Sequence, residues 1–427
     1  MKTSILLDHE PVDAGRVVRM LLRVEAEAPA RTDRLPLNLS IVLDRSGSMH
    51  GGKLHAACAA AALLVRRLSP DDLVSVVAYD DVVHTVAEPA KGAQQAELPR
   101  AIETIETGGS TNLSGGWLRG RELVARNIVE RGVNRVILLT DGQANVGILD
   151  PQQLTGLSAQ GKKDGVTTTT IGFGADYDEG LLRGMADAGG GNMYYIERPD
   201  QAPSIFADEL QGLLDLGAQN VAVSVVPAAA AQLAAVHHDY PSTSTAAGLR
   251  IDMGDLYARE PKPLLAEFLV AHESAGETAV AELVITADVL TADGGVEHQT
   301  LRLPVTISAA EGARVEPELR RELLLLEVAR ARRNALECRE RGDYAGAADK
   351  LREARRRMHA AGIDDDELRE EASDLALMQD SMVAGSFAVA DEKYMYQRAY
   401  NTSTGRRKKD ELIRRMKQAR RTEPPET

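Results

Sequence analysis

Two short apolar stretches that end in carboxylates constrain the fold of this chain more than any other feature. The first alternates from Leu37 to Ile41, is continuous to Leu43 and ends in Asp44, and the second runs from Val136 to Thr140 and ends in Asp141. Short, nearly continuous apolar runs are typical of strands that are buried on both faces, as in the parallel sheets of α/β proteins. The sequence therefore predicts two buried strands, each with an aspartate at its carboxyl end.

Hydroxyl side chains accompany these aspartates. Ser46 and Ser48 follow Asp44 at alternate positions, and Thr111 lies in a glycine-rich stretch. Carboxylate and neutral hydroxyl oxygens are the ligands that a small hard cation such as Mg²⁺ prefers. The Asp-x-Ser-x-Ser pattern alone has a second interpretation, because Ser46 or Ser48 could cap the helix that follows. The metal-site hypothesis therefore depends on all three stretches together.

The three stretches together resemble the von Willebrand factor type A domain and its metal-ion-dependent adhesion site. The resemblance covers roughly residues 36–217 and implies a Rossmann-like, doubly wound sheet of six mostly parallel strands. It implies Mg²⁺ as the bound ion, with Mn²⁺ or Ca²⁺ as alternatives, and one coordination position left for an Asp or Glu carboxylate of a partner protein. The implied metal ligands are Asp44, Ser46, Ser48, Thr111 and Asp141.

Strand and helix periodicities alternate along this region, which is the pattern of a doubly wound α/β domain. An edge strand starting at Val82 follows its predecessor after only Asp80-Asp81. Two residues cannot hold a crossover helix, so this edge strand must be antiparallel to its neighbour. In the strand order 3-2-1-4-5-6, the first and fourth strands are neighbours at the point where the order reverses. This order, which the family also implies, would bring Asp44 and Asp141 to one crevice.

The rest of the chain predicts a β-sandwich followed by helices. Strand-like segments in residues 1–35 and 218–312 indicate one antiparallel sandwich into which the α/β domain is inserted, as in sandwich-flanked bacterial members of the family. Residues 313–400 have a helical pattern. Residues 401–427 form a basic tail, which is either a solvated helix face or frayed end, or a docking arm for an acidic partner, membrane surface or nucleic acid.

The whole chain excludes some classes of protein. A formal net charge of −14 argues against broad affinity for nucleic acid, which requires concentrated positive charge. No stretch approaches the roughly 20 apolar residues of a membrane-spanning helix, and the N-terminal apolar run is too short for a signal peptide. Cys58 and Cys338 are expected to be buried thiols, as in a reducing compartment. A cytoplasmic protein is therefore expected.

These observations favour a metal-dependent protein-binding module, a scaffold or adaptor, over an enzyme. A Mg²⁺-dependent phosphohydrolase is an alternative, because aspartates at strand ends also serve phosphoryl transfer. Position 46 is serine, however, where the nucleophile loop of such an enzyme would carry a second aspartate. A third hypothesis is a substrate adaptor for a ring ATPase on a separate chain, since no Walker A motif is present. Gly108, Gly109, Gly115 and Gly116 are hinge candidates around Thr111.

Overall fold

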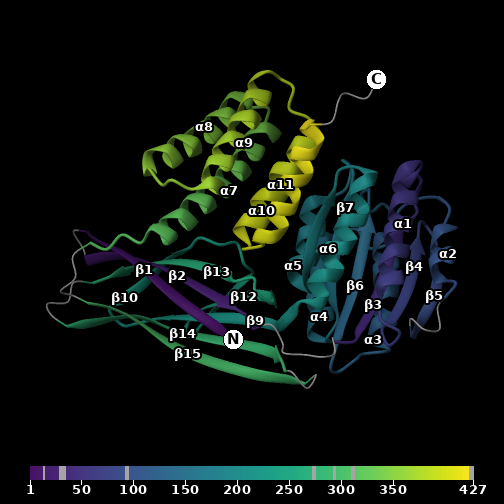
Figure 1. The fold of residues 1–427 in the computed structure, drawn as a ribbon, viewed down its shortest axis with the longest axis horizontal. Helices are drawn as coiled ribbons and strands as arrows, with labels where there is room; N and C mark the ends of the chain where they lie inside the picture. Colours follow the sequence, from purple (N-terminus) through teal and green to yellow (C-terminus); the bar gives the residue numbers. More distant parts are fainter. Residues whose placement is uncertain are drawn as a thin grey trace. The chain divides into compact units, whose positions relative to one another are not determined.

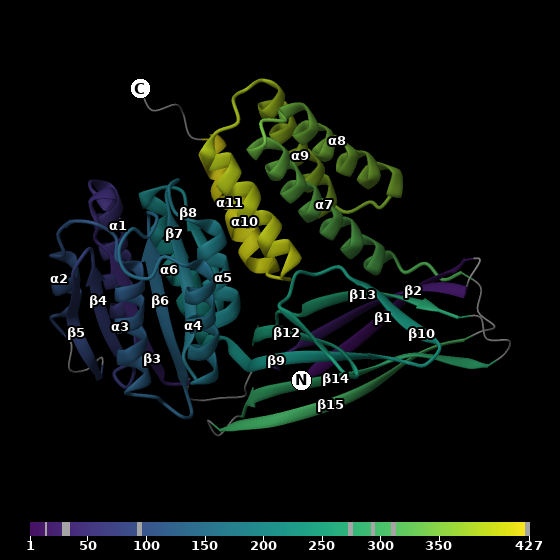
Figure 2. The same cartoon turned by 180° about the vertical axis from the view of Figure 1, so that it is seen from behind.

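The computed structural model describes residues 1–12, 15–27, 35–91, 96–271, 276–291, 295–308 and 313–422, with side chains up to Lys417. The chain divides into two compact units, which are described separately (Figures 1 and 2). The α/β unit contains Ala28–Gln219 and Leu290–Glu297. The sandwich–helix unit contains Met1–Glu27, Asn220–Val289 and His298–Thr427. The exact bounds predicted for the five segments of the chain remain a prediction.

The α/β unit is built on a six-stranded sheet with the order β5-β4-β3-β6-β7-β8. All neighbouring strands are parallel except β4 and β5, which are antiparallel. The predicted strand order and the antiparallel edge strand are therefore confirmed. The strands are β3 (Leu37–Asp44), β4 (Leu73–Tyr79), β5 (Val83–Lys91), β6 (Val133–Thr140), β7 (Thr167–Phe173) and β8 (Gly190–Ile196).

Helices cover both faces of this sheet (Figures 1 and 2). α1 packs against α2 and α6, whereas α3 packs against the central strands and α4 packs against α5. Asn112 and Asp150 cap α3 and α4 by accepting hydrogen bonds from the amides of Gly115 and Gln152. The helices are α1 (Gly52–Arg67), α2 (Leu98–Glu103), α3 (Leu113–Ala125), α4 (Pro151–Lys163), α5 (Glu179–Gly189) and α6 (Ala202–Leu214).

The sandwich–helix unit contains two antiparallel sheets, with the orders β1-β2-β13-β10 and β11-β12-β9-β14-β15. β2 pairs with β13, so strands that precede the α/β unit join strands that follow it. The predicted insertion is therefore confirmed. The strands are β1 (Lys2–Val12), β2 (Gly15–Glu25), β9 (Leu216–Pro227), β10 (Ala231–Val236), β11 (Ser242–Thr245), β12 (Gly248–Tyr257), β13 (Lys262–Val270), β14 (Glu277–Leu290) and β15 (Val296–Ser308).

Five helices complete this unit: α7 (Pro317–Glu340), α8 (Tyr344–Ala361), α9 (Asp366–Val383), α10 (Val389–Ser403) and α11 (Arg407–Thr422). Leu319 and Leu326 of α7 share a buried apolar cluster with Leu21 and Leu265 of the first sheet. In the described part of the chain, no helix is both long and apolar enough to cross a membrane.

The basic segment expected to be a tail packs against its own unit over the part that the structure describes. Arg407 contacts Glu322 at 2.6 Å, and Lys417, which is buried, contacts Asp391 at 2.8 Å. The prediction of a solvated helix face is therefore wrong for Lys417. The side chains of Arg420 and Arg421 and all of residues 423–427 lie outside the described residues.

Candidate functional site

The carboxyl ends of β3 and β6 bring two predicted ligands together. Asp44 ends β3, Asp141 directly follows β6, and both side chains are fully buried. Oγ of Ser48 donates a hydrogen bond to Oδ1 of Asp141 at 2.5 Å, and Oγ of Ser46 lies 3.1 Å from Oγ of Ser48. The main-chain amide of Ser46 also donates to Oδ1 of Asp44 at 2.8 Å. Four of the five predicted ligands are therefore linked in one cluster.

Thr111 joins the cluster from the loop that precedes α3. A Cβ atom placed on Gly142 would lie 3.4 Å from Oγ of Ser48 and 4.0 Å from Oγ1 of Thr111, so both hydroxyls flank this glycine. Asn145 holds Thr111 in place through two hydrogen bonds. The main-chain amide of Thr111 donates to Oδ1 of Asn145 at 2.8 Å, and the main-chain amide of Asn145 donates to the carbonyl of Thr111 at 3.1 Å. The structure thus places the fifth predicted residue beside the other four.

Main-chain hydrogen bonds fasten the first and second loops of the site to each other. The amide of Gly47 donates to the carbonyl of Gly109 at 2.9 Å, and the amide of Gly108 donates to the carbonyl of Arg45 at 2.7 Å. A Cβ atom on Gly108 would lie only 1.7 Å from Oδ2 of Asp80. A side chain at position 108 would therefore displace the carboxylate of Asp80, which is held by Arg45 and by the amide of Gly109.

The same physical reason accounts for another glycine proposed as a hinge. A Cβ atom on Gly116 would lie 2.4 Å from Cδ1 of Tyr79, so α3 and β4 approach closely at this point. Gly116 lies within α3, behind the loop that carries Thr111. The hinge interpretation is therefore not needed for Gly116.

Two residues of the site were missed in reading the sequence. Oγ1 of Thr140 donates to Oδ2 of Asp44 at 2.7 Å, and Nζ of Lys53 lies 2.6 Å from Oδ2 of Asp141. Thr140 immediately precedes a predicted ligand, and that adjacency was the available signal. Lys53 lies at the start of α1. Its contact depends on how the end of β6 meets the first turn of α1, which no local pattern specifies.

The electrostatics of the cluster favour a cation. Burial raises the pKa of Asp44, hydrogen bonds from Ser46 and Thr140 lower it, and the charge of Asp141 raises it again, with a net upward shift. Arg45, the basic residue that follows Asp44, is engaged with Asp80 at 2.8 Å. The two buried carboxylates are therefore near enough for the charge of Asp141 to raise the pKa of Asp44, and the ammonium group of Lys53 contacts Asp141. A further positive charge would stabilise their ionised forms.

The available oxygens fit a hard metal ion. Among the described residues, no group of three or more His, Cys, Asp and Glu side chains is placed to hold a metal. Hydroxyl oxygens are therefore needed to complete any site built on Asp44 and Asp141. A set of carboxylate and hydroxyl oxygens suits Mg²⁺ and not a thiolate- or imidazole-seeking ion.

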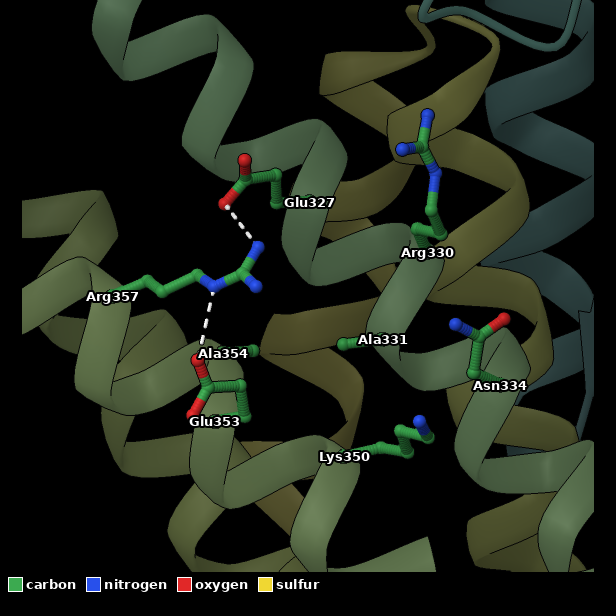
Figure 3. Close-up of a pocket in the computed structure, with 8 residues that line it drawn as sticks. All are labelled: Glu327, Arg330, Ala331, Asn334, Lys350, Glu353, Ala354 and Arg357. Atoms are coloured by element: carbon green, nitrogen blue, oxygen red, sulfur yellow. Dashed lines mark hydrogen bonds and ion pairs between the residues drawn. The ribbon is translucent and has the colours of Figure 1, made fainter.

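A groove of about 200 Å³ in the sandwich–helix unit lies between α7 and α8 (Figure 3). Ala331 of α7 and Ala354 of α8 line this groove, and their small side chains do not fill it. Both carboxylates of the groove, Glu327 and Glu353, contact Arg357, at 3.7 and 3.1 Å. The groove gathers charges of both signs and brings together no set of oxygen ligands like that at the strand ends. It is lined by Glu327, Arg330, Ala331, Asn334, Lys350, Glu353, Ala354 and Arg357.

Comparison with known proteins identifies the domain that carries the strand-end cluster. Residues 38–208 match the family model of the von Willebrand factor type A domain. This chain contains a von Willebrand factor type A domain. The matched range includes all six strands of the central sheet and all five predicted ligands.

Relatives of known sequence occur in bacteria and animals. The chain is 29% identical to the uncharacterized protein sll0103 of Synechocystis sp. over 365 residues, which cover 82% of this chain and 86% of that protein. It is 31% identical to the uncharacterized protein YfbK of Escherichia coli, over 48% of this chain and 37% of YfbK. It is 29% identical to human inter-alpha-trypsin inhibitor heavy chain H3, over 37% of this chain and 19% of that protein. This chain thus spans only a minor part of the length of the last two relatives.

Two solved structures resemble nearly the whole chain. A von Willebrand factor type A protein from Catenulispora acidiphila has a TM-score of 0.67 at 18% identity, covering 92% of this chain and 88% of the other. The ArnB paralog VWA2 from Sulfolobus acidocaldarius has a TM-score of 0.55 at 16% identity, covering 96% and 97%. At these identities the likeness shows a shared fold, type A domain and flanking parts included.

Proposed function

We propose that the type A domain binds a divalent cation, foremost Mg²⁺, and uses it to capture a carboxylate of a partner protein. The observation that carries this proposal is the convergence of two fully buried carboxylates and their hydroxyl neighbours at the ends of β3 and β6. Type A domains commonly mediate protein–protein interactions and are generally non-catalytic. The residues that would hold the ion are Asp44, Ser46, Ser48, Thr111 and Asp141.

Each residue has a distinct task in this proposal. Asp44 and Asp141 supply two negative charges, which balance a divalent ion, while the hydroxyls of Ser46, Ser48 and Thr111 supply neutral oxygens. Thr140 at the end of β6 and the amide of Ser46 in the loop after β3 hold the two oxygens of Asp44. Ligands oriented in this way by their neighbours lose less freedom when the ion binds. The bound ion supplies an open coordination position for an outside carboxylate.

The residue at position 46 of the first loop agrees with a scaffold or adaptor role. Ser46, a neutral ligand, stands where the nucleophile loop of a phosphohydrolase would carry a second carboxylate. The loop therefore offers metal-binding oxygens without an evident second acid for phosphoryl transfer. We propose a non-enzymatic, metal-dependent interaction as the function.

The test is calorimetric titration of Mg²⁺ and Mn²⁺ into the metal-free full chain, for the wild type and for Asp44→Asn. We expect one ion per wild-type chain and no measurable binding by Asp44→Asn. Asp81→Asn is the matched control, because Asp81 is an exposed carboxylate next to the same loops and is not among the five ligands. Affinity capture from lysate, repeated with EDTA, then asks whether a bound partner leaves with the metal. A wild type that binds neither ion would overturn the proposal.

A further inference from the structure

A lysine of the chain itself reaches into the proposed metal site. Nζ of Lys53 lies 2.6 Å from Oδ2 of Asp141 and 3.5 Å from the carbonyl oxygen of Ser48. The Asp141 side chain is fully buried, whereas 29% of the Lys53 side chain is exposed. The part-exposed lysine side chain therefore brings its ammonium group into contact with a buried carboxylate.

Both oxygens of this carboxylate are already engaged. Oδ1 of Asp141 accepts from Ser48 at 2.5 Å, and Oδ2 is in contact with Lys53. An incoming cation that draws on the charge of Asp141, directly or through water, must share it with the ammonium group. Two cations close together at a largely buried carboxylate repel each other more strongly than they would in water.

The backbone at Gly174 leaves room for the end of the Lys53 side chain. A Cβ atom on Gly174, just after β7, would lie 3.4 Å from both Cε and Nζ of Lys53. Gly174 has φ of +77°, in the left-handed region that favours glycine. The end of the lysine side chain therefore packs against the loop that follows β7, which gives the ammonium group a defined position at Asp141.

We propose that Lys53 is a tethered competitor cation that a divalent ion must displace from Asp141 in order to bind. This inference rests on the proposed metal site. In the metal-free protein, the ammonium group compensates the buried charge of Asp141 and so stabilises the empty site. The same contact weakens the net affinity for metal, because binding has to break an existing ion pair. Occupancy of the site would then follow the concentration of divalent ions instead of being permanent.

The test compares Mn²⁺ affinity among variants of the full chain by calorimetry. Lys53→Met removes the charge while keeping a long side chain, and Lys53→Arg keeps the charge. We expect Lys53→Met to bind Mn²⁺ about ten-fold more tightly than the wild type, and Lys53→Arg to stay close to it. Lys91→Met is the matched control, because Lys91 also lies in the α/β unit, is exposed and pairs with a single aspartate, Asp71. It changes the net charge equally but should leave Mn²⁺ affinity unchanged.

Thermal unfolding supplies a second measurement. In EDTA, Lys53→Met should unfold at a lower temperature than the wild type, because Asp141 loses its compensating charge, and saturating Mn²⁺ should remove this difference. Lys53→Gln gives the same comparison if the methionine variant fails to fold. Equal or weaker Mn²⁺ binding by the charge-removing variants than by the wild type would overturn the competitor role while leaving the metal site standing. Absence of Mn²⁺ binding by every variant and by the wild type would overturn the metal site and this inference together.

Discussion

The hydroxyl of Thr140 donates a hydrogen bond to Oδ2 of Asp44 across 2.7 Å, so the residue before one proposed metal ligand orients the other. Changing Thr140 to Val removes the hydroxyl and keeps the shape of the side chain. We expect this variant to bind Mg²⁺ about 10–100-fold more weakly in calorimetry, as is typical when a residue that orients a ligand is lost. Thr140→Ser, which keeps the hydroxyl, should bind nearly as the wild type does. Wild-type affinity in Thr140→Val would show that this hydrogen bond does not matter for the metal.

Metal removal should lower the stability of the α/β unit. A ligand that binds only the native state stabilises it by about 2.7 kcal/mol when its concentration is about 100 times its dissociation constant. Chemical denaturation in excess Mg²⁺ and in EDTA should show a difference of about this size for the wild type. Asp141→Asn should show no difference between the two conditions. If Mg²⁺ still raises the free energy of unfolding of Asp141→Asn, the ion binds at another site.

Arg135 and Glu209 form an ion pair that lies beneath the surface of the same unit. Nη1 of Arg135 lies 3.1 Å from Oε1 of Glu209, and both side chains are almost completely buried. Arg135→Met should cost about 3–5 kcal/mol of unfolding free energy, because it leaves a buried carboxylate without its cation. Adding Glu209→Gln should recover part of this loss, because it removes the unpaired charge and keeps an acceptor for Asn192 and Tyr194. Urea denaturation of the single and double variants measures both effects. An unchanged free energy of unfolding in Arg135→Met would contradict a stabilising role of this ion pair.

The stability of the sandwich–helix unit should depend on pH through Lys262. Burial lowers the pKa of Lys262 to about 7, whereas the unfolded chain keeps this proton up to about pH 10.4. Between these values the unfolded state binds more protons, so this group raises the free energy of unfolding as the pH rises from about 7 to 10. The wild type should therefore gain stability relative to Lys262→Met between pH 6 and pH 9. An equal difference at both pH values would contradict the lowered pKa.

Local patterns in the sequence predicted most of the architecture. The buried runs of β3 and β6 and the two-residue turn before β5 follow from periodicity and loop length, which are local properties. The insertion between sandwich strands was predicted from strand-like segments on both sides of the domain together with the resemblance to sandwich-flanked members of the family. Asp150 and Pro151 likewise mark the start of α4. The set of five proposed ligands came from the resemblance to the type A domain, because carboxylate and hydroxyl residues stand at the positions that match its adhesion-site motif.

What local patterns could not supply are contacts that depend on side-chain packing. Thr140 and Lys53 touch the two aspartates only because two strand ends and a helix start meet in space. The prediction of a solvated helix face was wrong at Lys417 for a related reason. Lys417 looked like part of a solvated surface until its partner Asp391, on another helix, was in place.

The pairing of β2 with β13 has a consequence for biosynthesis. β1 and β2 leave the ribosome as a hairpin whose sheet neighbour, beginning at Lys262, is made only after the whole inserted domain. At about 5–20 residues per second, that delay is on the order of ten to fifty seconds. During this time the type A domain can fold, while the hairpin keeps an open edge that is prone to wrong pairing. The nascent chain therefore passes through a stage in which the type A domain is complete while the first two strands still lack their neighbour in the sheet.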